Sequence, residues 1–131
     1  MRVVLDTNVI VAAFAARGLC AEVFEVCVAG HNLIISEHIL AEVARALLKK
    51  VKLPKKIAQD VINYLRDTAE TVEPDTIDIP ECKDKDDLPV ISTAIKGKAL
   101  FIVTGDADLL ALKNVRGIDF VSPREFWERV R

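Results

Sequence analysis

Residues 1–14 read MRVVLDTNVIVAAF, an apolar stretch that contains one carboxylate, Asp6. Residues 2–6 form a short apolar run, as the buried strand of a parallel sheet does, and a helix is predicted from Asn8 onward. Asp6 interrupts the apolar run, although a buried carboxylate without a partner is strongly unfavourable. We therefore expect Asp6 to have a functional role at the end of the first strand.

Length and composition indicate one globular domain. The chain has 131 residues, and we predict a single domain over residues 1–131. Its residues are 51% hydrophobic, mostly Val, Ile, Leu and Ala, which is typical of a parallel sheet covered by helices. No apolar stretch reaches the roughly 18 residues that cross a bilayer, so we expect a cytoplasmic protein with no membrane partner. The net charge of -2 argues against a protein that coats nucleic acid through bulk charge.

Strand patterns alternate with helical patterns along the chain. Strands are predicted at residues 2–6, 32–36, 71–73, 100–103 and 118–121. Helices are predicted from residue 8, at 21–29, 37–50, 54–70, 88–96 and 106–113, and after Ser122, where Ser122 and Glu125 form a capping box. In the helix over residues 54–70, we expect Ile57, Val61, Ile62 and Leu65 to face inward. These elements predict an α/β three-layer sandwich with a mostly parallel five-stranded sheet.

Acidic residues recur where such a sheet binds its ligands. Asp6 ends the first strand and Asp106 follows the fourth. Asp87 ends a polar, acidic loop over residues 74–87, which we expect to be exposed and which precedes the helix that leads to the fourth strand. Glu42 lies at the border of the apolar stripe of its helix. Ligands of open parallel sheets bind at the carboxyl ends of strands, where the strand order reverses. We therefore expect these acids to converge on one edge.

Each residue also has an ordinary structural explanation. Asn8, Asp87 and Asp106 precede helices, where an N-cap stabilises a helix by roughly 0.5 to 2 kcal/mol. Taken alone, Glu42 is explained as a solvated helix residue. His31 and His38 are interpreted as surface residues.

The joint pattern points to a hard divalent cation. Clustered carboxylates do not all stay ionised unless a positive charge compensates them. The candidate ligands are all oxygen atoms, and no histidine or cysteine has ligand spacing. This donor set favours Mg²⁺ or Mn²⁺ over zinc.

The same residues resemble a known family. The residues that carry the resemblance are Asp6-Thr7-Asn8 after the first strand, Glu42 in ISEHILAEV, Asp87 in DLPVISTA, and Thr104 to Asp108 in IVTGDADLL. Together they resemble the PIN domain, and in particular VapC-type toxins of toxin–antitoxin systems. The resemblance covers nearly the whole chain. It implies a metal-dependent ribonuclease with a sheet of order 3-2-1-4-5 and an acidic pocket between strands one and four.

The resemblance also implies roles for residues and partners. By position, the four acids of the family carry over to Asp6, Glu42, Asp87 and Asp106, with supporting groups at Asn8, Thr104 and Asp108. The implied partners are an RNA substrate and a cognate antitoxin that covers the acidic pocket. The resemblance and the apolar helix faces together predict a homodimer. We expect its contact at Ile57, Val61 and Leu65.

Three alternatives stay open. A phosphatase of the haloacid dehalogenase type also has an acid after its first strand, but it requires a second acid where this chain has Asn8. A degenerate domain would bind RNA or a protein without catalysis. A structure-specific DNA nuclease would need clamps that so short a chain lacks.

A basic cluster stands outside the acidic motif. It consists of Lys49, Lys50, Lys52, Lys55 and Lys56. Such a cluster could follow an RNA backbone. The ordinary interpretation is a solvated helix hairpin.

Overall fold

The computed structural model describes residues 1–130, so Arg131, the last residue of the expected domain, lies outside the described residues. The strands are β1 (Arg2–Leu5), β2 (Asn32–Ile35), β3 (Glu70–Thr71), β4 (Phe101–Val103), β5 (Asn114–Val115) and β6 (Ile118–Val121). The helices are α1 (Thr7–Ala15), α2 (Leu19–Gly30), α3 (Glu37–Lys49), α4 (Lys55–Thr68), α5 (Leu88–Lys96), α6 (Ala107–Leu110) and α7 (Pro123–Val130), with a 3-10 turn η1 (Lys85–Asp87) before α5. Within residues 1–130, no helix is both long enough and apolar enough to span a membrane.

The strands form one mixed sheet in the order β3-β2-β1-β4-β6-β5. Every neighbouring pair is parallel except β5 and β6. The predicted order and the parallel character are confirmed, but the predicted number of five strands is wrong. The sixth strand, β5, follows the helix that was predicted over residues 106–113, and this helix is shorter than predicted because α6 ends at Leu110.

A tight hairpin explains the extra strand. Val115 pairs with Ile118, so only Arg116 and Gly117 connect β5 to β6. Both have positive φ, of 51° and 83°, as the two central residues of a type I′ turn require. Asn114 supports the turn, because its side-chain oxygen accepts a hydrogen bond from the Gly117 amide at 3.2 Å.

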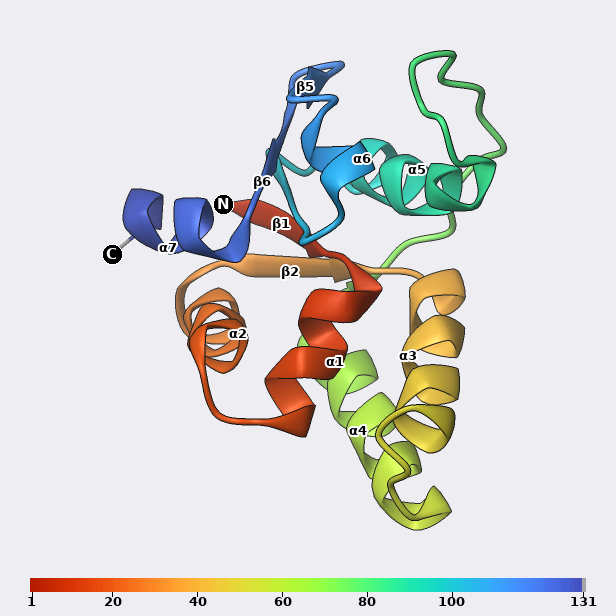
Figure 1. The fold of residues 1–131 in the computed structure, drawn as a ribbon, viewed down its shortest axis with the longest axis vertical. Coiled ribbons are helices and arrows are strands. Elements are labelled where there is room, and N and C mark those ends of the chain that lie inside the picture. Colours follow the sequence, from red (N-terminus) through yellow and green to blue (C-terminus); the bar gives the residue numbers. More distant parts are fainter. Residues whose placement is uncertain (131) are drawn as a thin grey trace.

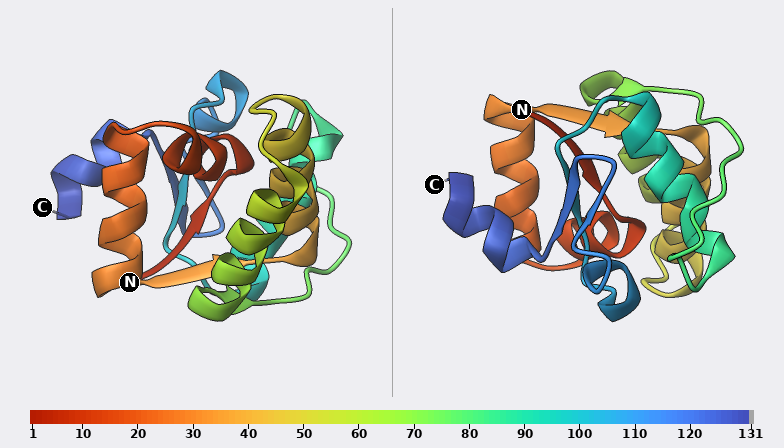
Figure 2. Two further views of the ribbon diagram at one scale, coloured as in Figure 1. Left: turned by 90° about the horizontal axis from the view of Figure 1, so that it is seen from below. Right: turned by 90° about the horizontal axis from the view of Figure 1, so that it is seen from above.

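Helices cover both faces of the sheet (Figures 1 and 2). Helices α1 to α4 lie on one side, and α5 lies on the other. Helix α7 packs against α2. A side chain at Gly97, at the end of α5, would collide with Ile34, so glycine allows α5 to approach β2 closely. The predicted capping box is confirmed, since the Glu125 amide donates to Ser122 Oγ at 3.1 Å and Glu125 Oε1 accepts from the Ser122 amide at 3.3 Å.

Two expectations about exposure need correction. Ile57 was expected to face inward, but it is 46% exposed, because it lies on the outer side of the first turn of α4. The loop at residues 74–87 was expected to be exposed, yet Ile79 and Cys82 within it are buried. This loop is thus held against the body of the protein just before the acidic residues that follow it.

Strand register brings the acidic motif to one edge. Leu5 at the end of β1 pairs with Val103 at the end of β4. The next residues, Asp6 and Thr104, therefore leave the sheet at the same level. The chain proceeds from β1 to β2 on one side and reaches β4 on the other, so this edge is the point where the strand order reverses.

Candidate active site

Asp6 is held at the base of the site by two neighbouring elements. The residue is 8% exposed, and its side chain caps α1. One oxygen, Oδ1, accepts a hydrogen bond from the Thr7 amide at 2.8 Å, and Oδ2 accepts one from Thr104 Oγ1 at 2.8 Å. Burial raises the pKa of Asp6, the two hydrogen bonds oppose this shift, and the Glu42 and Asp106 carboxylates add to it.

Glu42 joins the site through Thr7. It lies in the second turn of α3, half-buried beside the apolar stripe. Thr7 Oγ1 donates a hydrogen bond to Glu42 Oε1 at 3.0 Å. His38, one helical turn earlier, places Nε2 3.4 Å from the same oxygen. His38 therefore has a partner in the site, which the sequence interpretation missed, although its spacing of four residues from Glu42 was the available signal.

Asp106 is both a helix cap and a pocket residue. Its Oδ1 accepts hydrogen bonds from the amides of Asp108 at 2.8 Å and Leu109 at 3.4 Å, at the start of α6. Its own amide donates to Thr104 Oγ1 at 3.0 Å. The capping explanation thus holds for Asp106, and it uses only one of the two carboxylate oxygens.

Asp87 shows most clearly that negative charge is concentrated here. It occupies the N-cap position of α5, but its side chain makes no capping hydrogen bond. Burial, followed by the nearby carboxylates of Asp106, Asp84 and Asp6, raises the pKa of Asp87 to about 6. The capping explanation therefore does not account for Asp87.

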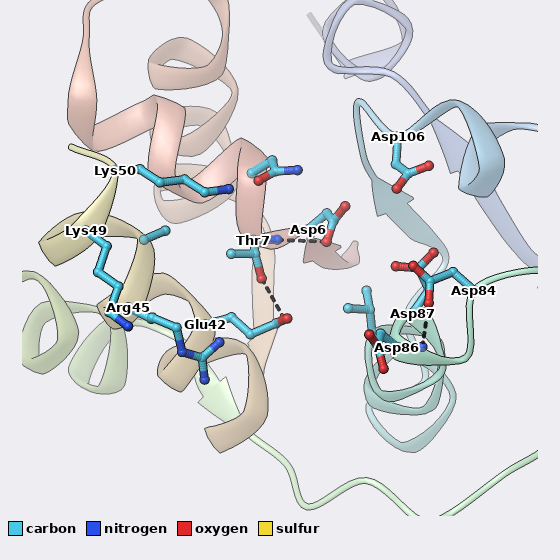
Figure 3. Close-up of a pocket in the computed structure, with 13 residues that line it drawn as sticks. Asp6, Thr7, Glu42, Arg45, Lys49, Lys50, Asp84, Asp86, Asp87 and Asp106 are labelled. Carbon is cyan, nitrogen blue, oxygen red and sulfur yellow. Dashed lines mark hydrogen bonds between the residues drawn. The ribbon is translucent and has the colours of Figure 1, made fainter.

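The four acids, Asp6, Glu42, Asp87 and Asp106, line one pocket of about 330 Å³ (Figure 3). Its lining includes Asp6, Thr7, Asn8, Glu42, Arg45, Lys49, Lys50, Asp84, Asp86, Asp87 and Asp106. Among the predicted supporting groups, Asn8 lines the pocket and Thr104 lies buried behind Asp6. Asp108 is exposed and does not line the pocket, although its charge contributes to the raised pKa of Asp87. Arg45 was missed by the sequence interpretation.

A hard cation fits this site by donor chemistry. Asp6, Asp87 and Asp106 offer only carboxylate oxygens, the ligands that Mg²⁺ and Mn²⁺ prefer. The raised pKa values of Asp6 and Asp87 indicate negative charge that a cation would compensate. The ligands are not preassembled, because no three Asp, Glu, His or Cys side chains of residues 1–130 are grouped closely enough to hold one ion. Like charges repel, so separated carboxylates are expected when no cation lies between them.

Comparisons with known proteins agree with this geometry. The sequence matches the PIN domain family over residues 2–108, and the chain belongs to this family. Among solved structures it is similar to a chain in the crystal structure of VapBC2 from Rickettsia felis bound to a DNA fragment from the promoter. That similarity has a TM-score of 0.64 at 18% identity and covers 93% of this chain and 98% of the other, and it shows a shared fold. No curated protein matches the chain.

Proposed function

We propose that this chain is a metal-dependent endoribonuclease, working as one nuclease domain over residues 1–131, and that it is the toxin of a toxin–antitoxin pair. The observation that carries the proposal is the convergence of Asp6, Glu42, Asp87 and Asp106 on one pocket at the switch point of the sheet. Four acids from four separate segments have no shared structural purpose there, since only Asp6 and Asp106 cap helices through their side chains.

The reaction is hydrolysis of a phosphodiester bond. Water adds to phosphorus, one phosphorus–oxygen bond breaks, and the leaving oxygen takes a proton. Mg²⁺ or Mn²⁺, when bound, supplies a Lewis acid and lowers the pKa of a coordinated water. Asp6, Asp87 and Asp106 are the residues that would hold it.

The surrounding residues orient these carboxylates. Thr104 and Thr7 fix both oxygens of Asp6, which prevents the carboxylate from rotating out of the pocket. Thr7 and His38 both contact Oε1 of Glu42, and within residues 1–130 no side chain donates a hydrogen bond to Oε2. Glu42 then either holds a second ion or orients the attacking water, and both roles use Oε2.

Two features support a toxin role. The fold is shared with a chain of the VapBC2 complex, and the pocket is strongly acidic on one wall. A cognate antitoxin would inhibit the enzyme by placing a basic or apolar segment over that wall. We further propose that the protein is a cytoplasmic homodimer.

One observation favours a second candidate, a PIN-like module that binds RNA or protein without catalysis. The carboxylates are not gathered into a finished ligand set within the described residues. The two candidates differ in a cleavage screen on mixed single-stranded RNAs and branched DNA with Mg²⁺, Mn²⁺ or chelator, followed by sequencing of the new ends. Cleavage of RNA that depends on metal supports the nuclease, whereas metal binding without cleavage supports the second candidate.

A further inference from the structure

Three basic side chains line the wall of the pocket that lies opposite the acidic loop. Arg45, Lys49 and Lys50 all belong to α3 or its C-cap, and all three are exposed. In Figure 3 they lie on the α3 side, whereas Asp84, Asp87 and Asp106 lie on the opposite side. The pocket therefore has one basic wall and one acidic wall.

None of these three cations forms an ion pair with any of residues 1–130, although six carboxylates line the same pocket. Lys49 and Lys50 have an ordinary explanation, because cations at a helix C-terminus interact favourably with the helix dipole. Arg45 has no such explanation, since it lies in the middle of α3. An unpaired arginine in the wall of a pocket is well suited to bind phosphate oxygens.

The pocket cations are spaced along one side of α3. Arg45 and Lys49 follow Glu42 by three and seven residues, so they lie on the same side of α3, about one and two turns farther along the helix. At 1.5 Å per residue, these positions are displaced by roughly 5 and 10 Å from Glu42. The basic side chains thus form a row that leads away from the acids towards the turn between α3 and α4.

The remaining lysines of this region differ from the row. Lys52, Lys55 and Lys56 do not line the pocket. Lys56 is paired with Asp60 on α4 at 3.3 Å. Of the lysines in the basic cluster, only Lys49 and Lys50 therefore line the pocket together with the acidic residues.

We propose that Arg45, Lys49 and Lys50, the α3 row, bind the phosphates next to the cleaved one in a single-stranded RNA. The RNA strand then leaves the acidic centre along α3 towards the α3–α4 turn. This inference rests on the proposed ribonuclease function, because it takes RNA as the substrate. It assigns binding to the α3 row and excludes Lys52, Lys55 and Lys56.

The test measures binding without cleavage. Asp87→Asn serves as the common background, because it removes a proposed metal ligand and some of the charge that repels RNA. Two triple variants are made in this background: Arg45→Gln with Lys49→Gln and Lys50→Gln, and Lys52→Gln with Lys55→Gln and Lys56→Gln as the control. Each removes three positive charges, so the two variants have the same net charge. Affinity for a fluorescent single-stranded RNA is measured by anisotropy in chelator over a series of salt concentrations.

The salt dependence reports the number of phosphate contacts. Each contact to a single strand contributes about 0.7 to the slope of log affinity against log salt, so loss of three contacts should reduce the slope by about 2. We expect this reduction in the α3 triple variant and a much smaller change in the control. Arg45→Gln alone should reduce the slope by about 0.7, which provides a second measurement if the triple variant folds poorly.

Three outcomes would overturn the inference. Equal losses in the two triple variants would mean that RNA responds to bulk charge. The inference would also be contradicted if the α3 triple variant bound RNA as tightly as the Asp87→Asn background. It would equally be contradicted if that background bound no RNA at low salt. Because no cleavage is measured, failure of the ribonuclease proposal is seen separately, in the absence of metal-dependent RNA cleavage by the wild type.

Discussion

Thr104 Oγ1 donates a hydrogen bond to Asp6 Oδ2 at 2.8 Å and accepts one from the Asp106 amide at 3.0 Å. One fully buried hydroxyl thus connects two acids that are 100 residues apart in the sequence. Because Asp6 also contacts Thr7, and Thr7 contacts Glu42, a continuous set of hydrogen bonds runs from Asp106 to Glu42 across the ends of β4 and β1. The geometry of the site is therefore built into the sheet.

Thr104→Val should destabilise the protein by about 1 to 3 kcal/mol, because it leaves Oδ2 of the buried Asp6 carboxylate without its hydrogen-bond donor. The shape of the side chain is nearly unchanged, so loss of packing contributes little. Thr104→Ser keeps the hydroxyl and is the control. The free energy of unfolding in urea checks the prediction, and equal stability of the two variants would show that the hydroxyl does not support Asp6.

Asp106 allows the capping and pocket roles to be separated. Asparagine is also a good N-cap, so Asp106→Asn should leave the metal-free protein equally stable or more stable, because one repelling charge is removed. Asp106→Ala should cost about 1 kcal/mol through loss of the cap.

The same variants test metal binding. An ion that binds only the folded state stabilises it by about 2.7 kcal/mol at a hundredfold excess over Kd. Millimolar Mn²⁺ should therefore raise the melting temperature of the wild type, and should raise that of both Asp106 variants much less. If Asp106→Ala is destabilising without metal, and Mn²⁺ affects no variant, then Asp106 is only a helix cap.

The stability of the metal-free protein should depend on Asp87. Its pKa is about 6 in the folded state against 3.8 for an ordinary aspartate, so the folded state binds more protons between these values. Stability should then fall as pH rises through this window, and Asp6, whose pKa is also raised, acts in the same direction. Glu37 and Asp119 have lowered pKa values and act in the opposite sense at lower pH.

The comparison of wild type with Asp87→Asn isolates this effect, because the other carboxylates are common to both proteins. We expect the variant to gain stability over the wild type as pH rises from about 4 to about 6 in chelator, with melting temperature as the measurement. A difference that stays constant over this range would contradict the raised pKa.

The homodimer prediction requires a corrected contact surface. Leu65 is fully buried in the core, so it is not available to a partner, whereas Ile57 and Tyr64 on α4 are 46% and 45% exposed. If α4 forms the contact, Ile57→Lys should convert a dimer to a monomer in light scattering without changing the circular dichroism spectrum. A wild type that remains monomeric at high micromolar concentration would argue against the dimer.

Most of the fold was predictable because its signals are local. The apolar strands, the amphipathic helices and the Ser122–Glu125 capping box follow from periodicity and cap chemistry. The β5–β6 hairpin was missed because β5 has two residues and its turn places Arg116 where glycine or asparagine is usual.

The site was only partly predictable for a related reason. Single acids at strand ends could be identified, because the ends of parallel strands share an edge. The contact of His38 with Glu42 could have been predicted from their spacing of four residues, but the position of Arg45 in the pocket wall depends on how α3 is rotated against the sheet. The sequence pattern places that rotation only approximately, since Glu42 lies at the border of the apolar stripe.

The most direct test of the account is metal-dependent cleavage by Asp6→Asn. Asparagine keeps the shape of the side chain and an oxygen for the Thr7 amide, so the circular dichroism spectrum should match that of the wild type. The wild type should cleave single-stranded RNA with Mn²⁺ and stop in chelator, whereas Asp6→Asn should not cleave under either condition. Undiminished cleavage by Asp6→Asn, or wild-type cleavage that persists in chelator, would contradict the proposed site.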